Sequence, residues 1–258
     1  MVSETNASSD QEEFSVGVSA FKEGNYALAH EKMLSLANKG YEGAQYILGV
    51  IYDGGLGVPA DKKVALEWWL QSAEKGNSSA QHNVGNAYQE GILVEQDYLK
   101  AAEWFMRAAK QDLAEAQVNL GILFEDGLGV TQNYSMAHDL YLRASEQGNA
   151  GAQNNLGLLY VQGLGVEKDF NQAIKWWRLS AKQGNDDAQT SLGFSYYYGR
   201  GVDKNRVKSL MWLLIAAQNG DEKGKKFSQL LVKEMNAIDI ANARTLAKKC
   251  VENGYAEC

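Results

Sequence analysis

The chain has 258 residues, a net charge of −7 at pH 7 and a pI near 5.1. An acidic chain without a basic stripe is a poor ligand for phosphate backbones, so we expect no nucleic-acid partner. No run of about 18 apolar residues occurs, which predicts no membrane span. One compact core would be near its size limit at this length, whereas an array of stacked units has no such limit.

The first thirteen residues are polar and lack the basic and apolar regions of a secretory signal peptide. We expect residues 1–13 to be a disordered tail, or the mature N-terminus of an exported protein whose signal has been removed. A cytoplasmic protein is the alternative. Residues 14–41 match a shortened copy of the unit that follows, and they are predicted to form an N-terminal capping helix pair.

From residue 42 onward the dipeptide Ala-Gln recurs every 36 residues, and a glycine follows each glutamine four positions later. A fixed period of this length indicates one structural unit that is copied and stacked. Each copy carries two helical patterns, helix A and helix B, and no convincing strand alternation. Five copies are predicted, at 42–77, 78–113, 114–149, 150–185 and 186–221.

The same residue types mark the helix ends in each copy. In the second copy, helix A is expected over about 78–90 and helix B over about 98–110. An Asp or Asn before helix B suits an N-cap, and a glycine after it suits a left-handed C-terminal position. Two positions depart from this pattern. Asp112-Leu113 replaces Gly-Asn, which predicts a looser turn, and Leu93 replaces a loop glycine, which predicts a different loop shape.

Large and small residues also follow the repeat. All six tryptophans fall in two adjacent helix B columns, where we expect them to fill the space between units. Stacking on a sugar or nucleobase is the alternative. The recurring glycine of helix A is expected to face a column of small residues on helix B, so that the two helices approach closely. That small column is Ala65, Ala101, Ala137, Ala173 and Ser209.

The pattern from Ala44 to Gly76 is Ala-x3-Leu-Gly-x2-Tyr-x2-Gly-Leu-Gly-Val, then Asp, Ala, Trp-Trp and Ala-x2-Gly. It resembles the Sel1-like repeat, a 36-residue relative of the tetratricopeptide repeat, and the resemblance covers about 42–221 in register. It implies an all-α fold, a right-handed α/α superhelix (solenoid) of about seven antiparallel helix pairs. Residues 222–258 would supply the C-terminal capping helix pair and tail. The resemblance also implies a scaffold that binds other proteins.

Candidate catalytic and metal-binding motifs are incomplete. Ser-x-x-Lys occurs at Ser19 and Ser72, but without the companion motifs of penicillin-interacting enzymes. His30, His82 and His138 lie in separate repeats, which favours structural or surface histidines over a metal site. We therefore predict a non-enzyme without cofactor or metal. A penicillin-binding or β-lactamase-like enzyme is the alternative.

Cys250 and Cys258 resemble the Cys-x7-Cys pairs that join helix B to the next helix A in secreted, cysteine-rich Sel1-like proteins. The resemblance implies a disulfide and an oxidising compartment, and hence a periplasmic or secreted protein. Two free thiols in a cytoplasmic protein are the alternative.

In a tetratricopeptide-like superhelix, the helix A columns that are not used for packing line the concave face. These columns vary between copies, so packing does not dictate them and they are free for recognition. The middle of the predicted groove is polar and acidic, with His82, Asn86, Gln89, Glu90, Glu125 and Asp126. Its C-terminal end is apolar and aromatic, with Leu158, Val161, Phe194, Tyr197 and Tyr198. Tyr46, Val118, Ile122 and Asn154 occupy the same set of columns.

The expected occupant is an extended or helical segment of another protein. Its apolar anchor would lie near Phe194 and Tyr197, and its basic residues opposite Glu90, Glu125 and Asp126. Alternatively, the tyrosines pack on the capping helix 225–235. We interpret the chain as a monomeric, exported bacterial adaptor. An immunity protein or inhibitor that sequesters a toxin or enzyme, and a binder of peptidoglycan fragments or sugars, are alternatives.

Overall fold

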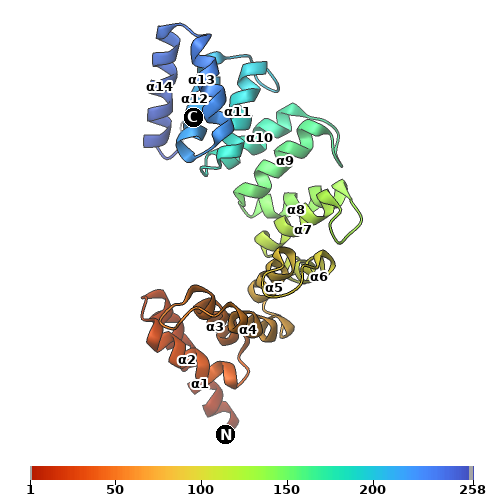
Figure 1. Cartoon of the computed structure of the whole chain (residues 1–258), viewed down its shortest axis with the longest axis vertical. Helices are drawn as coiled ribbons and strands as arrows, with labels where there is room; N and C mark the ends of the chain where they lie inside the picture. The colour runs from red at the N-terminus through yellow and green to blue at the C-terminus, as the bar shows by residue number, and fades with distance from the viewer. Residues whose placement is uncertain (1, 256–257) are drawn as a thin grey trace. The chain divides into compact units, whose positions relative to one another are not determined.

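The computed structural model describes residues 2–255 and 258, with the backbone alone for residues 2–8. Fourteen α-helices and no strand make up this part of the chain, which is all-α as predicted (Figure 1). The helices are α1 Val2–Lys22, α2 Tyr26–Asn38, α3 Glu42–Gly54, α4 Lys62–Glu74, α5 Ser78–Glu90, α6 Tyr98–Ala109, α7 Ala114–Asp126, α8 Tyr134–Glu146, α9 Ala150–Gln162, α10 Phe170–Ala181, α11 Asp186–Tyr198, α12 Arg206–Asn219, α13 Glu222–Lys233 and α14 Ala237–Glu252.

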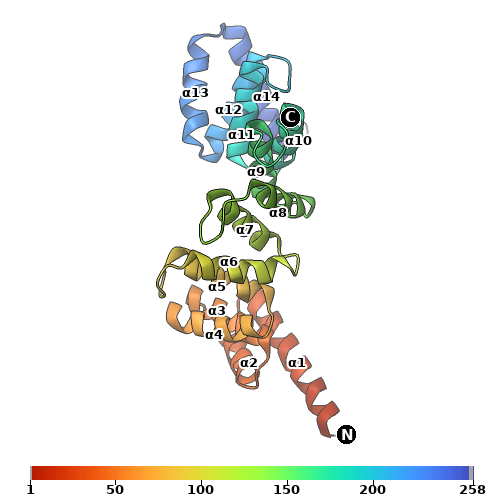
Figure 2. The same cartoon turned by 90° about the vertical axis from the view of Figure 1, so that its right-hand side faces the viewer.

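The chain divides into two compact units. The first covers the chain through Leu123 together with Gly127–Thr131, and the second covers Phe124–Asp126 together with Gln132–Cys258. In the first unit each helix from α1 to α6 packs against the next one along the chain, and α8 to α12 do the same in the second (Figure 2). This consecutive pairing is what an α-solenoid requires, because each helix pair buries its apolar face only against its neighbours.

The predicted helix ends are confirmed. Asp61 caps α4, because its carboxylate accepts from the amides of Lys63 and Val64 at 3.0 and 3.1 Å. The other four copies place the same kind of cap before helix B, with Asp97, Asn133, Asp169 and Asn205. The boundary glycines Gly76, Gly148, Gly184 and Gly220 take left-handed φ values of 88–112°. The residue types at the helix ends therefore match the N-cap hydrogen bonds and left-handed turns that the structure has at these positions.

The expectation of altered backbone at the two departures is wrong. Asp112 takes φ 61°, and the amide of Leu113 still donates to the carbonyl of Ala108 at 3.3 Å, as in the other boundary turns. Leu113 offers no side-chain cap, so this boundary loses a hydrogen bond and keeps its shape. Leu93 takes φ 70°, within the 68–72° of the glycines at this position in the other copies. A leucine held in this region carries about 1–3 kcal/mol of strain.

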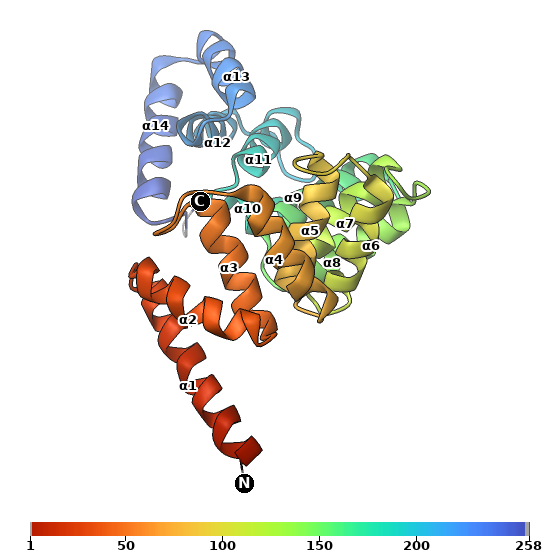
Figure 3. The same ribbon diagram turned by 60° about the horizontal axis from the view of Figure 1, so that its bottom comes forward.

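The N-terminal segment also differs from the prediction, because α1 begins at Val2 and includes most of the expected tail (Figure 3). The ammonium group of Lys39, the C-cap residue of α2, lies 2.6 Å from a carboxylate oxygen of Asp10 and 3.6 Å from one of Glu13. These ion pairs dock the second half of α1 onto α2. Met1 lies outside the described residues.

The Ala-Gln column connects each helix pair to the preceding one. Each glutamine is buried, and its side-chain amide donates to a carbonyl near the end of the preceding helix B, at 3.1–3.4 Å. In three copies its Oε1 accepts from a side-chain amide at the end of the following helix B or in the turn just after it, at 2.9–3.0 Å. Burial without these partners would leave an unsatisfied amide at a cost of about 1–3 kcal/mol, which explains why this residue recurs.

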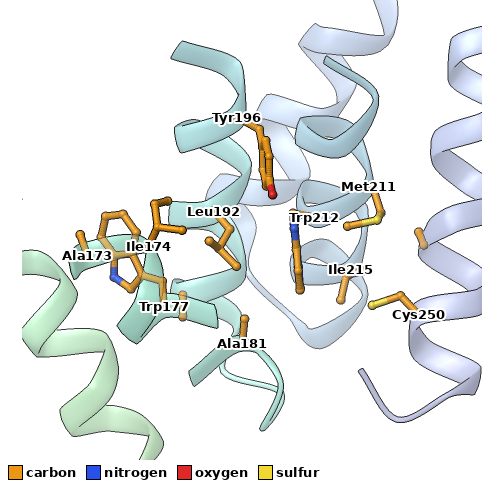
Figure 4. Packing of buried hydrophobic residues seen from close by; sticks show 12 residues of the cluster. Ala173, Ile174, Trp177, Ala181, Leu192, Tyr196, Met211, Trp212, Ile215 and Cys250 are labelled. Atoms are coloured by element: carbon orange, nitrogen blue, oxygen red, sulfur yellow. The ribbon is translucent and has the colours of Figure 1, made fainter. Parts of the chain in front are cut away.

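The helix A glycines face large side chains, and the predicted contact with the small column is found at Gly193, whose carbonyl accepts from the hydroxyl of Ser209 at 2.8 Å. A Cβ atom at Gly49 would lie 2.2 Å from Trp69, and one at Gly157 would lie 2.3 Å from Trp177. A Cβ atom at Gly85 would likewise lie too close to Phe105, and one at Gly193 too close to Leu213. The glycine is therefore needed to admit a bulky side chain between the helices. Trp177 and Trp212 lie in a buried cluster of the second unit, as the packing interpretation predicts (Figure 4).

The C-terminal helices cover α12 from two sides. Both α13 and α14 pack against α12, which lies between them in Figure 2. Leu231 of α13 and Ala243 of α14 join a buried cluster with Leu210 and Leu213 of α12. The two elements lie close to the expected 225–235 and 237–253, but their shared partner is α12.

Candidate binding grooves

The second unit contains an apolar groove of about 290 Å³, formed by α9, α10 and α11. Leu158 and Val161 come from α9, and Phe194 and Tyr198 come from α11. All four were predicted from the variable helix A columns, and the structure brings them together. Leu158 is 37% exposed and Tyr198 is 53% exposed. The remaining lining residues are Phe170, Trp177, Ser191, Ser195 and Arg200.

Phe194 and Tyr197 also contact the capping helix α13. The ring of Phe227 lies 4.8 Å from that of Phe194 and 5.1 Å from that of Tyr197, both edge to face. The hydroxyl of Tyr197 donates to Glu234 at 3.4 Å. The alternative, in which these aromatic residues pack on the capping helix, therefore describes Tyr197 and in part Phe194. Tyr198 lines the groove and is 53% exposed.

Asn154 is not available for recognition, which corrects its assignment to the groove. It is only 7% exposed, and its backbone carbonyl accepts from the indole nitrogen of Trp177 at 3.2 Å. Thr190, one copy further on, is also buried, and its hydroxyl donates to Asp221. In the second unit this column is therefore part of the packing interface between helices.

Glu125 is engaged within the chain rather than free to meet a basic partner. Its Oε2 accepts from the hydroxyl of Tyr141 at 2.8 Å. Burial raises the pKa of Tyr141, and the neighbouring Glu125 carboxylate raises it further, so the phenol stays protonated and keeps donating. Asp126, the next residue, is exposed.

The first unit has a groove of its own, of about 410 Å³, with mixed lining. Of the predicted residues it includes Asn86 and Glu90. Ile92 and Leu93 also line it, and both are exposed, Leu93 by 54%. Sequence reasoning did not assign either residue to a surface. The signal was present in Leu93, a bulky apolar side chain at a left-handed loop position that glycine fills in every other copy.

The backbone explains why Leu93 opens this surface. At the equivalent loop positions, a Cβ on Gly129 or Gly165 would lie 2.2–2.4 Å from the backbone at the start of a preceding helix B. The Cβ of Leu93 excludes such an approach. The loop of the second copy must therefore stand further from the start of α4, where Lys62 lines the groove.

Two predicted polar residues of the first unit, His82 and Asn86, both contact Asn119. The side-chain amide of Asn119 donates to Asn86 at 2.9 Å and lies 3.1 Å from Nε2 of His82. Burial lowers the pKa of His82, opposed by the nearby Glu115, so the imidazole is held neutral. The other predicted residues of this unit, Tyr46, Gln89, Val118 and Ile122, are half-buried.

The structure gives the motifs considered for catalysis and metal binding other roles. Ser72 is fully buried, and its hydroxyl donates to the carbonyl of Glu42 at 2.7 Å. His30 lies 3.0 Å from the hydroxyl of Tyr52, and His138 lies 3.3 Å from that of Tyr160. Within the described residues, no cluster of three or more potential metal ligands occurs. These residues serve packing between neighbouring helices.

The disulfide implied by the sequence resemblance is present between Cys250 and Cys258. It closes a short loop in which Tyr255 donates its amide to the carbonyl of Cys250 at 2.8 Å. The hydroxyl of Tyr255 lies 3.1 Å from the side-chain nitrogen of Asn219 in α12. The loop thereby holds the end of the chain against the last full repeat.

The Sel1 repeat model matches five consecutive segments of the chain, at residues 43–77, 78–113, 114–149, 150–185 and 186–221. The chain belongs to the Sel1 repeat family. Four of the matched segments have the bounds of the copies predicted from the 36-residue period, and the first begins one residue later, at 43 rather than 42. None of the curated proteins matches the chain. No helix in the described part of this Sel1 repeat protein is long and apolar enough to cross a membrane.

Solved structures agree with the family assignment. The chain is similar to c5321, a protective antigen present in uropathogenic Escherichia coli strains, with 31% identity and a TM-score of 0.81. That match covers 98% of this chain but only 56% of the antigen. A Sel1 repeat protein from Oxalobacter formigenes is 31% identical with a TM-score of 0.79, over 92% of this chain and 99% of that one. A putative Sel1 repeat protein from Klebsiella pneumoniae shares the fold at 20% identity and a TM-score of 0.51, over 79% of this chain and 99% of that one.

Proposed function

We propose that this Sel1 repeat protein is a non-catalytic scaffold that binds a segment of another protein in the groove between α9 and α11. The observation that carries the proposal is the exposure of Leu158 and Tyr198 beside one another in an apolar groove. Both belong to helix A columns that the repeat does not need for packing. Exposed aromatic and aliphatic residues gathered in one concave place are typical anchors for a partner side chain.

The groove's size favours a peptide over a folded ligand or a cofactor. At about 290 Å³ it is just below the roughly 300–1,000 Å³ range of small-molecule pockets, and it is open to solvent along the helices. An apolar side chain of a partner fits inside it, while the rest of the partner segment follows α9 and α11. Such a contact provides binding without a catalytic step, which fits the function of an adaptor.

We further propose that the protein works as a monomer in an oxidising compartment, the periplasm or the cell exterior. The Cys250–Cys258 disulfide supports this location, since disulfides persist mainly outside the reducing cytosol. The bacterial origin of the related structures is consistent with it.

The test is a selection of short random peptides displayed on phage against the full chain. The same selection is run against a variant with Leu158→Ser and Tyr198→Ala, two exposed positions whose replacement leaves the buried clusters intact. Circular dichroism and the thermal midpoint verify that the variant is folded. Peptides that bind the natural chain and not the variant support the proposal, whereas enrichment that is the same for both, or none at all, refutes it.

A matched control uses an exposed residue of α10 that does not line the groove. Leu179 on α10 is exposed and lies outside the groove, so Leu179→Ser removes a similar apolar area elsewhere. Peptides selected on the natural chain should bind Leu179→Ser with unchanged affinity. The pair Phe194→Ala and Tyr197→Ala is less informative, because both residues also support α13.

A further inference from the structure

The lining of the apolar groove in the second unit carries a positive charge, although the chain as a whole is acidic. Arg200 is the one charged residue among those that line the groove. Its guanidinium lies 5.0 Å from the ring centre of Tyr198. Two lysines lie over neighbouring aromatic rings, Lys168 at 5.1 Å from Phe170 and Lys204 at 5.8 Å from Tyr197.

These cations have no acidic partner of their own. Within the described residues, no carboxylate lies at ion-pair distance from Arg200, Lys168 or Lys204. The aromatic contact engages the face of the guanidinium or the ammonium group and leaves the N–H donors available. A guanidinium edge is well shaped for a carboxylate, which it binds through two parallel hydrogen bonds.

We propose that the occupant of this groove is an acidic peptide segment, with one apolar side chain between Leu158 and Tyr198 and a flanking carboxylate on Arg200. This inference rests on the proposed function and specifies the partner's chemistry. The sequence instead predicts a partner with basic residues, because Glu90, Glu125 and Asp126 are expected to face it. Glu125 is occupied by Tyr141, and the groove that the apolar residues form carries no acidic lining residue.

The position of the cations explains how such a segment would be selected. Lys168 and Lys204 belong to the loops that follow α9 and α11, and Arg200 belongs to the second of these loops. Arg200 and Lys168 contact the rings of Tyr198 and Phe170, which line the groove, whereas the ring of Tyr197 under Lys204 does not line it. A segment with its apolar anchor in the groove therefore meets the guanidinium of Arg200, which attracts a carboxylate next to the anchor and repels a basic side chain there.

The phage selection described above, continued with synthetic peptides, tests this inference. Peptides that depend on Leu158 and Tyr198 are sequenced, and the charge of the residues beside their apolar anchor is compared with that of the unselected library. Enrichment of Asp and Glu beside the anchor is expected. Groove-dependent peptides that are neutral or basic beside the anchor would overturn the inference while leaving the proposed function standing.

Charge reversal at one site provides the quantitative arm. For a selected acidic peptide, Arg200→Glu should raise Kd at least about tenfold at low salt, and the difference should shrink at high salt. Lys175→Glu is the matched control, because Lys175 also lies over an aromatic ring, at 5.2 Å from Trp176, but outside the groove. Equal losses in the two variants would show that only the net charge matters, and would reject Arg200 as the recognition residue. Absence of any groove-dependent peptide would instead refute the proposed function itself.

Discussion

The indole nitrogen of Trp177 donates to the backbone carbonyl of Asn154 at 3.2 Å, directly over the place where Gly157 has no side chain. A Cβ at Gly157 would lie 2.3 Å from that nitrogen. Gly157→Ala should therefore push the ring out of its site and lower the free energy of unfolding by about 1–3 kcal/mol. Urea denaturation followed by tryptophan fluorescence measures this loss.

Gly151, in the first turn of the same helix, is the control for that substitution. A Cβ there would meet only the side-chain oxygen of Asn149, at 3.3 Å. Gly151→Ala should leave stability unchanged or raise it slightly, since alanine favours a helix. If both variants lose the same stability, the explanation by the tryptophan site is wrong.

The buried glutamine column yields a second prediction. Gln189 donates to the carbonyl of Ala181 at 3.1 Å and accepts from Asn219 at 3.0 Å. Gln189→Leu leaves both of those groups without this partner and should cost about 1–3 kcal/mol. Gln162→Leu, at an exposed position of α9, should change little. Chemical denaturation of the two variants measures this difference. Equal free energies of unfolding would show that the hydrogen bonds of Gln189 do not stabilise the fold.

Leu93 should be a site where a smaller residue stabilises the fold. Leu93→Gly removes the strain of a left-handed leucine and should raise the free energy of unfolding by about 0.5–1.5 kcal/mol, after allowing for the freedom glycine adds to the unfolded chain. Leu93→Ala shortens the side chain and keeps the strain, so it should bring no gain. If the denaturation midpoint of Leu93→Gly falls below that of the natural chain, the apolar contacts of Leu93 stabilise the fold by more than its backbone strain destabilises it.

His82 should make stability depend on pH in mildly acidic solution. Burial lowers its pKa below the ordinary value of about 6.5 that the unfolded chain retains. As pH falls through 6.5 the unfolded state takes up a proton before the folded state does, so stability decreases with falling pH and is fully present above that value. Unfolding free energies at about pH 7.5 and about pH 5.5 should differ less for His82→Gln than for the natural chain. An identical pH dependence in the two proteins would exclude His82 as the source.

The C-terminal disulfide gives a fifth prediction. Replacing Cys250 and Cys258 by serine, or reducing them, frees a short closed loop and should cost about 2–3 kcal/mol by the loop-entropy relation. Hydrogen exchange at the end of α14 and around Asn219 should increase, because the hydroxyl of Tyr255 is held there by the loop. Intact mass with and without reductant checks the bond itself, and two free thiols in the exported protein would contradict the proposed compartment.

The fold was predictable because each helix end carries its own local chemistry. Asp61 and its equivalents satisfy the first amides of helix B from two or three residues away, and such short-range contacts can be read from sequence. The partner of Gly157 was not predictable in the same way. Column spacing shows which residues recur, but not which of two adjacent helix B columns points at the glycine.

The site was predictable only where a column stays out of the packing. Leu158 and Tyr198 do so, and both line the apolar groove of the second unit. The column of Asn154 varies between copies, and yet Asn154 is buried beside Trp177, whose indole nitrogen donates to its backbone carbonyl. Variation between copies therefore signals freedom from one shared contact, while a copy-specific contact such as Tyr141 with Glu125 leaves no trace in the pattern.

Leu93 and Asp112 keep the left-handed backbone of the glycines they replace. The hydrogen bonds of the turns, rather than the absence of a side chain, thus hold the copy in shape once its neighbours are in place. A repeat can lose its signature glycines during divergence and remain structurally whole. Family searches that weight those glycines heavily will undercount copies in distant members, and the substituted positions are the places to look for surfaces that one member has acquired and others lack.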